Sequence, residues 1–389
     1  MLRLIRKGDQ ERGAIAVIVA LVASTLVLTG VAALAIDAGS LYAERRVLQN
    51  GADSASLALA QICAKNINDA LCDKTTGMTY LKSLVNGNAT LDHLPSISEV
   101  CGSGPAAGKF GACAGGTALT DCPVLPAALQ ANVNLNWVQV KTRYSVPRIF
   151  SGLGGNAYEG TVQACARAAW GAAGVGRATL PLTFSLCEWD SATAPANAGG
   201  PRLYGSAHET FIALNYEVNP KKPPCYTYAT GEYKNGHDFP GAFGWTDRNL
   251  DCSVDFVNGE WITGTSSDSN GSGAKDCADE INLKIGDDVY MPIYDCIDQA
   301  FDDSRCTPTN SQANYHVFGL AAFHITAIDG FGVQLDGGST TAALKAACKK
   351  GSVGTKCLYG YFTQGLASVG TIGGPGTHDL GVKVVQVAG

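Results

Sequence analysis

Charged residues are absent from positions 14 to 36, a run of 23 residues. A helix of that length rises about 34 Å, which is enough to cross a bilayer core of about 30 Å. Proline is absent from positions 14 to 66, so no proline interrupts the helix there. Before the run stand four basic residues against two acidic ones, which predicts a cytoplasmic N-terminus and an extracytoplasmic body. The basic residues are Arg3, Arg6, Lys7 and Arg12.

Cysteine is absent from the first 62 residues, and all 14 cysteines follow the apolar run. Disulfides persist outside the cytosol, so this distribution predicts an oxidised body with up to seven bridges. The alternative for any one cysteine is a buried free thiol. No C-x-x-C spacing is present, which argues against a zinc site. Connectivity stays open, but four pairs are close enough to close short loops: Cys63/Cys72, Cys113/Cys122, Cys296/Cys306 and Cys348/Cys357.

Familiar catalytic signatures are missing. The chain has no G-x-S-x-G, no H-E-x-x-H and no G-x-x-x-x-G-K-[ST] motif. After residue 13 it holds 24 Lys and Arg against 32 Asp and Glu, a net charge of −8. Such an acidic balance argues against nucleic-acid binding, which uses basic patches to meet phosphates. We therefore expect no enzyme, no nucleic-acid partner and no small-molecule substrate, with an envelope hydrolase lacking a familiar motif as the least favoured alternative.

The main alternative to a retained anchor is a cleavable signal peptide. The tripeptide Ala33-Leu34-Ala35 has the small-x-small form that signal peptidase reads. The apolar run, however, is longer than the about 7–15 residues of an ordinary signal-peptide core. We therefore predict a retained single-pass transmembrane helix and a lipid bilayer as its partner.

Residues 37–66 predict an amphipathic helix that continues the membrane helix outward as a stalk. Ala and Leu favour helix there, whereas Gly39 and Gly51 each weaken it by about 1 kcal/mol. The apolar face needs a partner, either the chain's own body or a neighbouring subunit. Apolar residues that recur on this face are Leu41, Val47, Leu48, Ala52, Ala55 and Leu59.

Beyond residue 132 the sequence becomes typical of β-structure. Short runs rich in Val, Ile and aromatic residues alternate with Gly, Pro, Asn and Asp. The predicted fold class is α+β: a transmembrane helix that continues into an amphipathic stalk helix, then a mostly antiparallel β ectodomain pinned by disulfides. The expected segments are a basic lead (1–13), the transmembrane helix (14–36), the stalk (37–66), a Cys- and Gly-rich connection (67–132), a β segment (133–175) and a C-terminal β-rich domain (176–389).

One segment has the oxygen-ligand spacing of a twelve-residue calcium loop. Its candidate ligands are Asp268, Asn270, Ser272, Asp276 and Asp279. Lys275 takes a usually aliphatic position, and the last ligand is Asp rather than the longer, bidentate Glu. A solvated turn rich in Ser, Asn, Gly and Asp is the alternative. We therefore predict no cofactor and keep calcium as the candidate to test.

An ordered motif surrounds the apolar run. A Glu-Arg-Gly lead precedes it, and an Asp-x-Gly, an aromatic, an Arg-Arg-x-Leu-Gln and an Ala-Asp-x-Ala-x-Leu-Ala follow it. This order and spacing resemble the anchor region of TadG-like Flp pilus assembly proteins. The motif residues are Glu11, Arg12, Gly13, Asp37, Gly39, Tyr42, Arg45, Arg46, Leu48, Gln49, Ala52, Asp53, Ala55, Leu57 and Ala58.

The resemblance implies a structural or assembly component of a bacterial Flp (Tad) type pilus, anchored in the inner membrane. It further implies contacts with other pilus-assembly or pilin subunits and no enzymatic reaction. The alternative is an extracytoplasmic binding or adhesion module that shares only the pilus-type anchor.

Overall fold

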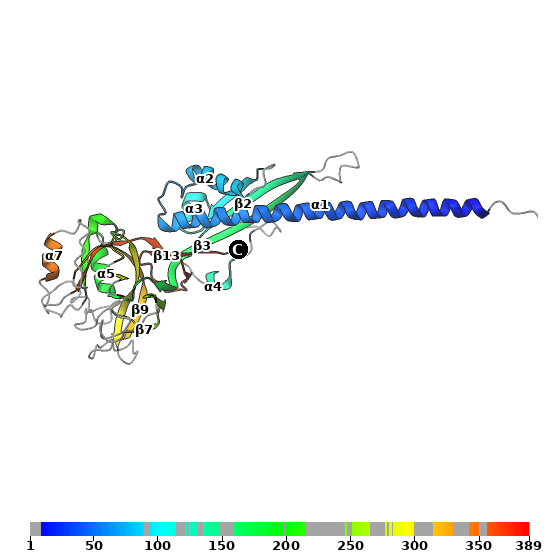
Figure 1. The fold of residues 1–389 in the computed structure, drawn as a ribbon. Helices are drawn as coiled ribbons and strands as arrows, with labels where there is room; N and C mark the ends of the chain where they lie inside the picture. Colours follow the sequence, from blue (N-terminus) through cyan, green and yellow to red (C-terminus); the bar gives the residue numbers. More distant parts are fainter. Residues whose placement is uncertain are drawn as a thin grey trace, which may run out of the picture.

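A long N-terminal helix joins a β-rich body in the computed structural model (Figure 1). The predicted α+β class is confirmed. The structure describes residues 9–88, 94–113, 122, 124–130, 135–147, 159–197, 199–214, 246, 251–264, 277, 280–281, 283–298, 314–329, 342–349 and 356–388.

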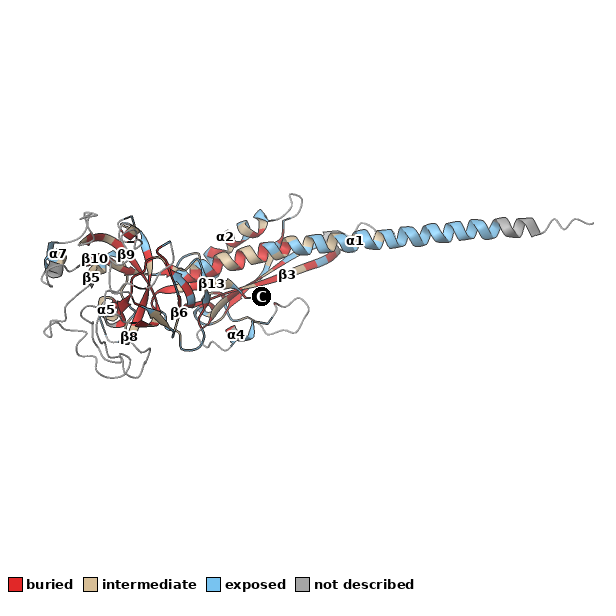
Figure 2. Cartoon of the chain, turned by 60° about the horizontal axis from the view of Figure 1, so that its bottom comes forward, coloured by how far each residue is buried: buried red, intermediate tan, exposed pale blue. Residues whose placement is uncertain are grey.

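Helix α1 (Asp9–Lys65) contains 57 residues and unites the predicted membrane helix and stalk without a break. It is about 86 Å long, and its first half projects away from the body (Figure 1). Figure 2 shows that this half is exposed, whereas the second half is partly buried. A Cβ added at Gly30 or Gly39 would meet no atom within 4 Å. The helix accommodates both glycines because most of their neighbours are good helix formers.

Among the described residues the first sheet has seven strands in the order β1-β2-β3-β13-β11, with β12 and β6 also paired to β3. Its longest ladder joins β2 (Asn136–Pro147) to β3 (Glu159–Ala178) in antiparallel register. Alternate residues of both strands are buried on the face toward α1, as the period of two along a strand requires. The other strands are β1 (Ser96–Gly102), β6 (Val254–Val257), β11 (Gly365–Leu366), β12 (Gly370–Ile372) and β13 (Val382–Val387).

The second sheet, in the part of the chain that the structure describes, has six strands in the order β4-β8-β9-β10-β5, with β7 paired to β9. One face packs on helix α5 (Leu186–Thr193) around three phenylalanine rings that meet edge to face. Those rings belong to Phe184, Phe323 and Phe362. The strands are β4 (Phe184–Ser185), β5 (Thr210–Leu214), β7 (Trp261–Thr263), β8 (Asp288–Asp298), β9 (Asn314–Asp329) and β10 (Lys356–Thr363).

Short helices complete the described part of the chain. Helix α2 (Lys74–Gly87) packs beside α1, where a Cβ on Gly51 would lie 3.4 Å from the Val85 side chain. The others are α3 (Pro105–Phe110), α4 (Ala127–Gln130), α7 (Ala342–Lys349) and the 3-10 helix η2 (Ser206–His208).

A shared apolar core joins the two sheets. Ala169 and Ala173 of β3 and Val384 of β13 lie in one cluster with Val317 and Leu320 of β9. All pairs between the described strands are antiparallel except β4 with β8 and β11 with β13, so the mostly antiparallel body is confirmed.

The boundary expected between residues 175 and 176 falls inside a strand. Strand β3 continues to Ala178, and β6 and β12 pair with its last residues. Strand β13, from the expected C-terminal domain, also pairs with β3. The local rise in glycine and alanine content therefore belongs to a long strand and does not mark a domain boundary.

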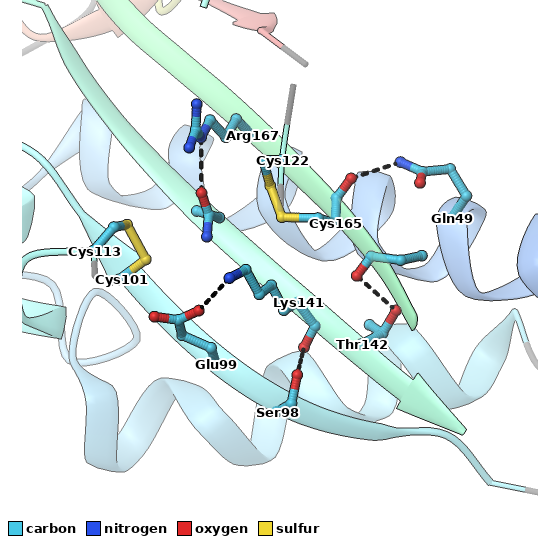
Figure 3. Close-up of a disulfide and its surroundings, with 12 residues drawn as sticks. Gln49, Ser98, Glu99, Cys101, Cys113, Cys122, Lys141, Thr142, Cys165 and Arg167 are labelled. Atoms are coloured by element: carbon cyan, nitrogen blue, oxygen red, sulfur yellow. Dashed lines mark hydrogen bonds and ion pairs between the residues drawn. A yellow bond between two sulfur atoms is a disulfide. The ribbon is translucent and has the colours of Figure 1, made fainter. Parts of the chain in front are cut away.

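Disulfides connect the elements of the first sheet. Cys63 and Cys72, a pair put forward from the sequence, are bonded and link α1 to the segment before α2. The pairing of Cys113 with Cys122 is wrong: Cys113 is bonded to Cys101 and Cys122 to Cys165 (Figure 3). Strand pairing brings distant positions within bonding range, with Cα–Cα distances of 5.0 and 5.1 Å.

The remaining described cysteines are also oxidised. Cys252 is bonded to Cys277 across 25 residues of sequence. Cys296 and Cys357 are disulfide-bonded as well, while Cys306 and the side chain of Cys348 lie outside the described residues. No free cysteine is present among the described side chains.

Candidate functional site

The first half of α1 turns apolar side chains outward. Its large apolar residues range in exposure from 50% at Ile36 to 73% at Leu34. The hydroxyls of Ser24, Thr25 and Thr29 donate to carbonyl oxygens about one turn earlier, at 2.8–3.1 Å. A helix of this kind suits lipid, where polar groups must find partners within the segment.

The second half of α1 buries one face against the first sheet. Leu48, Ala52, Ala55 and Leu59 are at most 1% exposed and recur every three or four residues. Ala55 and Leu59 share a core cluster with Val138 of β2. The amphipathic stalk is confirmed at these positions, and its partner is the chain's own sheet.

Side-chain hydrogen bonds tie the stalk to the neighbouring strands (Figure 3). The Nε2 atom of Gln49 donates to the carbonyl oxygen of Cys165 at 3.0 Å and to Asp53 Oδ1 at 2.9 Å. Thr142 Oγ1 donates to the carbonyl oxygen of Leu48 at 3.2 Å. The motif residues Gln49 and Asp53 thus act together, because Asp53 holds the Gln49 amide in position toward β3.

The far end of the stalk is held by the C-terminal strand. Lys383 of β13 donates from Nζ to the carbonyl oxygen of Ala64 at 3.2 Å, and Asp379 Oδ2 lies 3.6 Å from the same Nζ. Ala64 is in the last turn of α1, where carbonyl oxygens lack helical partners and a cation is favourable. The two residues are 319 positions apart, so no local pattern in the sequence signals the contact.

Other motif residues do not pack on the sheet. Arg45 and Arg46 are exposed, and Gly39 faces open space. Asp37, just past the apolar run, has a buried Oδ1 with no hydrogen-bond partner in the described part of the chain. The lead residues 11–13 lie in α1, but their side chains are outside the described part.

A family model matches this same stretch of helix. It is described as Flp pilus-assembly TadE/G-like, and it covers residues 13–61. The N-terminal helix contains a Tad-like domain. No curated protein and no solved structure matches the chain.

The Tad-like domain spans the exposed apolar half of α1 and most of the docked stalk. The resemblance to TadG-like Flp pilus assembly proteins that the sequence indicated is confirmed for these residues. The match and the exposed apolar helix together indicate a membrane anchor whose sequence is similar to that of TadE/G-like Flp pilus-assembly proteins. The match ends at residue 61, before the disulfide between Cys63 and Cys72.

Carboxylates near the Tad-like domain and in the body cap turns. Asp73 Oδ1 accepts from the N–H of Thr75 at 2.8 Å at the start of α2, and this bond holds the pKa of Asp73 below its ordinary value. The hydroxyl and N–H of Ser253 lower the pKa of Asp251 in the same way.

A buried phenol lies in the second sheet. Burial raises the pKa of Tyr359 to about 12, so this side chain is protonated at neutral pH.

A cavity of about 380 Å³ lies between the start of α3, the middle of β3 and the segment before β13. Its ionisable side chains are Asp379 and Lys383, which lie close to each other. The Lys383 amine also donates to the carbonyl oxygen of Ala64, so this side chain connects the cavity wall to the end of α1.

The candidate calcium ligands predicted from the sequence form a separate group. Asp268, Asn270, Ser272, Asp276 and Asp279 all lie outside the described residues. Among the side chains that the structure describes, no group of three His, Cys, Asp or Glu is arranged to hold a metal ion.

A histidine on the second sheet forms a link that the sequence does not signal. His316 Nδ1 lies 2.6 Å from Asp295 Oδ1, and its Nε2 lies 3.0 Å from the carbonyl oxygen of Gly259. The ring therefore bridges β8 and the turn between β6 and β7. Both ring nitrogens are thus engaged by oxygen atoms of the chain itself.

Proposed function

We propose that this chain is a non-enzymatic, membrane-anchored component of Flp-type pilus assembly in a bacterial inner membrane. Its N-terminus lies in the cytoplasm and its β-rich body outside. The observation that carries the proposal is the position of the Tad-like match, residues 13–61, on a helix whose first half is exposed and apolar. The basic lead supports this orientation, and the oxidised cysteines support an extracytoplasmic body.

The body is placed against the membrane surface by the β2–β3 hairpin, which runs beside α1 toward its N-terminus (Figure 1). Thr142 is level with Leu48, which it contacts. The strand continues from Thr142 to Pro147, about 17 Å further. The same distance along a helix is about 11 residues and leads from Leu48 to about Asp37. The hairpin therefore extends to the height at which the apolar run ends.

This geometry supports a role in which the protein holds its body in a fixed position relative to the membrane. The stalk is fixed along its length by a buried face, by Gln49 and Thr142, and at its end by Lys383. A body joined to its anchor in this way cannot swing freely, so it can present a defined surface to neighbouring pilus-assembly subunits. The structural engagement of Lys383 and His316 supports the non-enzymatic part of the proposal.

Deletion of the gene, followed by imaging of pili, tests the proposal. We expect fewer or shorter pili, restored by the full chain. Complementation with residues 37–389 on a foreign transmembrane helix is the matched control, because it keeps the docked stalk and the body and replaces only the membrane-spanning part of the Tad-like domain. Normal number, length and adhesion of pili after deletion would contradict the proposal.

The same chimera separates the alternative function. Binding of cells or glycans by the body on a foreign anchor, with unchanged piliation in the deletion strain, would establish an adhesion module instead. Loss of piliation that only the native anchor repairs would support assembly.

A further inference from the structure

Three residues of the stalk share a face that nothing in the described structure covers. Tyr42 is 74% exposed, and Arg45 and Arg46 are also exposed. The spacing i, i+3 and i+4 places their side chains next to one another on the helix surface. Leu48, three residues after Arg45, borders this face and packs on the sheet, where it is 1% exposed. Gln49, which donates to the Cys165 carbonyl oxygen, follows one turn later, so the exposed face flanks the docked side of the stalk on the turns nearest the apolar run.

The two arginines stay unpaired in an acidic body. Neither guanidinium forms a hydrogen bond or an ion pair with any residue that the structure describes. Elsewhere in the described body Arg177 is paired with Asp255 and Arg202 with Asp190, whereas Arg143 of β2 is exposed like the two stalk arginines. The unpaired cations of the stalk therefore remain available to an anionic partner from outside the chain.

Their height along α1 identifies that partner. Counted from Ile36, the last residue of the uncharged run, Tyr42 lies about 9 Å and Arg46 about 15 Å further along the helix. The polar headgroup layer extends about 5–8 Å beyond the hydrocarbon core on each side. Helical side chains lean toward the N-terminus, and long basic side chains reach back toward the interface. Both guanidinium groups therefore return to the outer edge of the headgroups.

The aromatic residue fits the same layer. Tyrosine is enriched where membrane meets water, since its ring is apolar and its hydroxyl is polar. The Tyr42 side chain is 74% exposed. It lies one helical turn nearer the membrane than the two arginines, at the depth of the headgroups.

We propose that Tyr42, Arg45 and Arg46 bind the headgroups of anionic phospholipids in the outer leaflet of the membrane that α1 crosses. This contact would fix the depth and rotation of the stalk. The inference rests on the membrane anchoring and orientation in the proposed function, and it is independent of the role in pilus assembly.

Lipid selectivity of the full chain tests the proposal. The chain is reconstituted in phosphatidylcholine vesicles, and its preference for spin-labelled phosphatidylglycerol over spin-labelled phosphatidylcholine is measured by electron paramagnetic resonance. We expect R45Q/R46Q to lower this preference by up to about thirtyfold at low salt, because two basic side chains near the headgroups are lost. The basic lead contributes equally to every variant, so only the difference between variants is interpreted.

K65Q/K82Q is the matched control, because it removes the same charge from exposed positions away from the membrane. Lys65 lies about 43 Å beyond Ile36 along α1. This control should keep the native preference. An unchanged preference in R45Q/R46Q, or an equal loss in both double variants, would overturn the proposal. Release of the native chain from vesicles by alkaline washing would instead contradict the anchoring itself.

A second experiment identifies what touches the face in cells. Tyr42 is replaced by the photo-crosslinking residue benzoylphenylalanine, and membranes are irradiated. Adducts with phospholipid support the proposal. Adducts with a polypeptide would overturn it, since the face would then be covered by a protein subunit.

Discussion

Replacing Leu59 with alanine tests whether the stalk half of α1 is held by the folded body. Leu59 is 0% exposed and lies in a core cluster with Val138, Val140 and Trp170. Buried leucine-to-alanine changes cost about 2–5 kcal/mol, depending on how far the surroundings collapse. Here the walls are a paired sheet and the small side chain of Ala55, which cannot fill the space. We therefore expect a loss of about 3 kcal/mol in the free energy of unfolding.

The change is compared with Leu34→Ala, which removes the same atoms from a position that is 73% exposed. That control should change the unfolding free energy of the body by less than about 0.5 kcal/mol. Both variants and the native chain are solubilised in detergent without reductant and heated while near-ultraviolet circular dichroism is recorded. Leu59→Ala should lower the apparent midpoint by several degrees, and Leu34→Ala should leave it unchanged.

Two results would refute the reasoning. An unchanged midpoint for Leu59→Ala would mean that the stalk is not docked on the sheet. An equal decrease in both variants would mean that the midpoint follows loss of helix hydrophobicity rather than loss of core packing.

Three further predictions concern the body. Replacing Cys122 and Cys165 by serine should cost about 4 kcal/mol, and replacing Cys63 and Cys72 about 2.6 kcal/mol, because the first loop spans 43 residues and the second 9. Thermal unfolding of both double variants measures this order, and a reversed order would contradict the loop argument. The pKa of Asp73 is lower in the folded chain, so its stabilising charge is present above its ordinary pKa and is lost as the pH falls through the folded value. The difference in unfolding midpoint between the native chain and Asp73→Asn should therefore shrink between about pH 5 and about pH 2, and a constant difference would argue against the charged cap. Calorimetric titration of calcium into the solubilised chain should give no saturable heat, since the predicted loop ends in Asp; saturable heat would establish the calcium site.

Prediction from the sequence is most successful where the pattern is local. Two such patterns lie within one helix and are predicted without knowledge of the rest of the fold. They are the apolar run at 14–36 and the recurrence of Leu48, Ala52, Ala55 and Leu59, and the structure has both on α1. The Tad-like motif lies within the same stretch, so its match at 13–61 follows from local order and spacing.

Prediction fails where partners come from distant strands. Cys113 and Cys122 are close in sequence, yet strand β1 brings Cys101 to the first and strand β3 brings Cys165 to the second. The boundary expected at 175 and 176 rested on composition, whereas pairing with β6, β12 and β13 keeps β3 continuous.

The sequence by itself determined the anchor, the amphipathic stalk and the oxidised, β-rich character of the body. These follow from composition and from periods of a few residues, which are properties of single segments. The tertiary structure alone decided that the stalk packs on the chain's own sheet, that Gln49 reaches Cys165, and that Lys383 holds the carbonyl oxygen of Ala64. Those contacts join residues 116 and 319 positions apart, and such pairings depend on how whole strands align rather than on any local pattern.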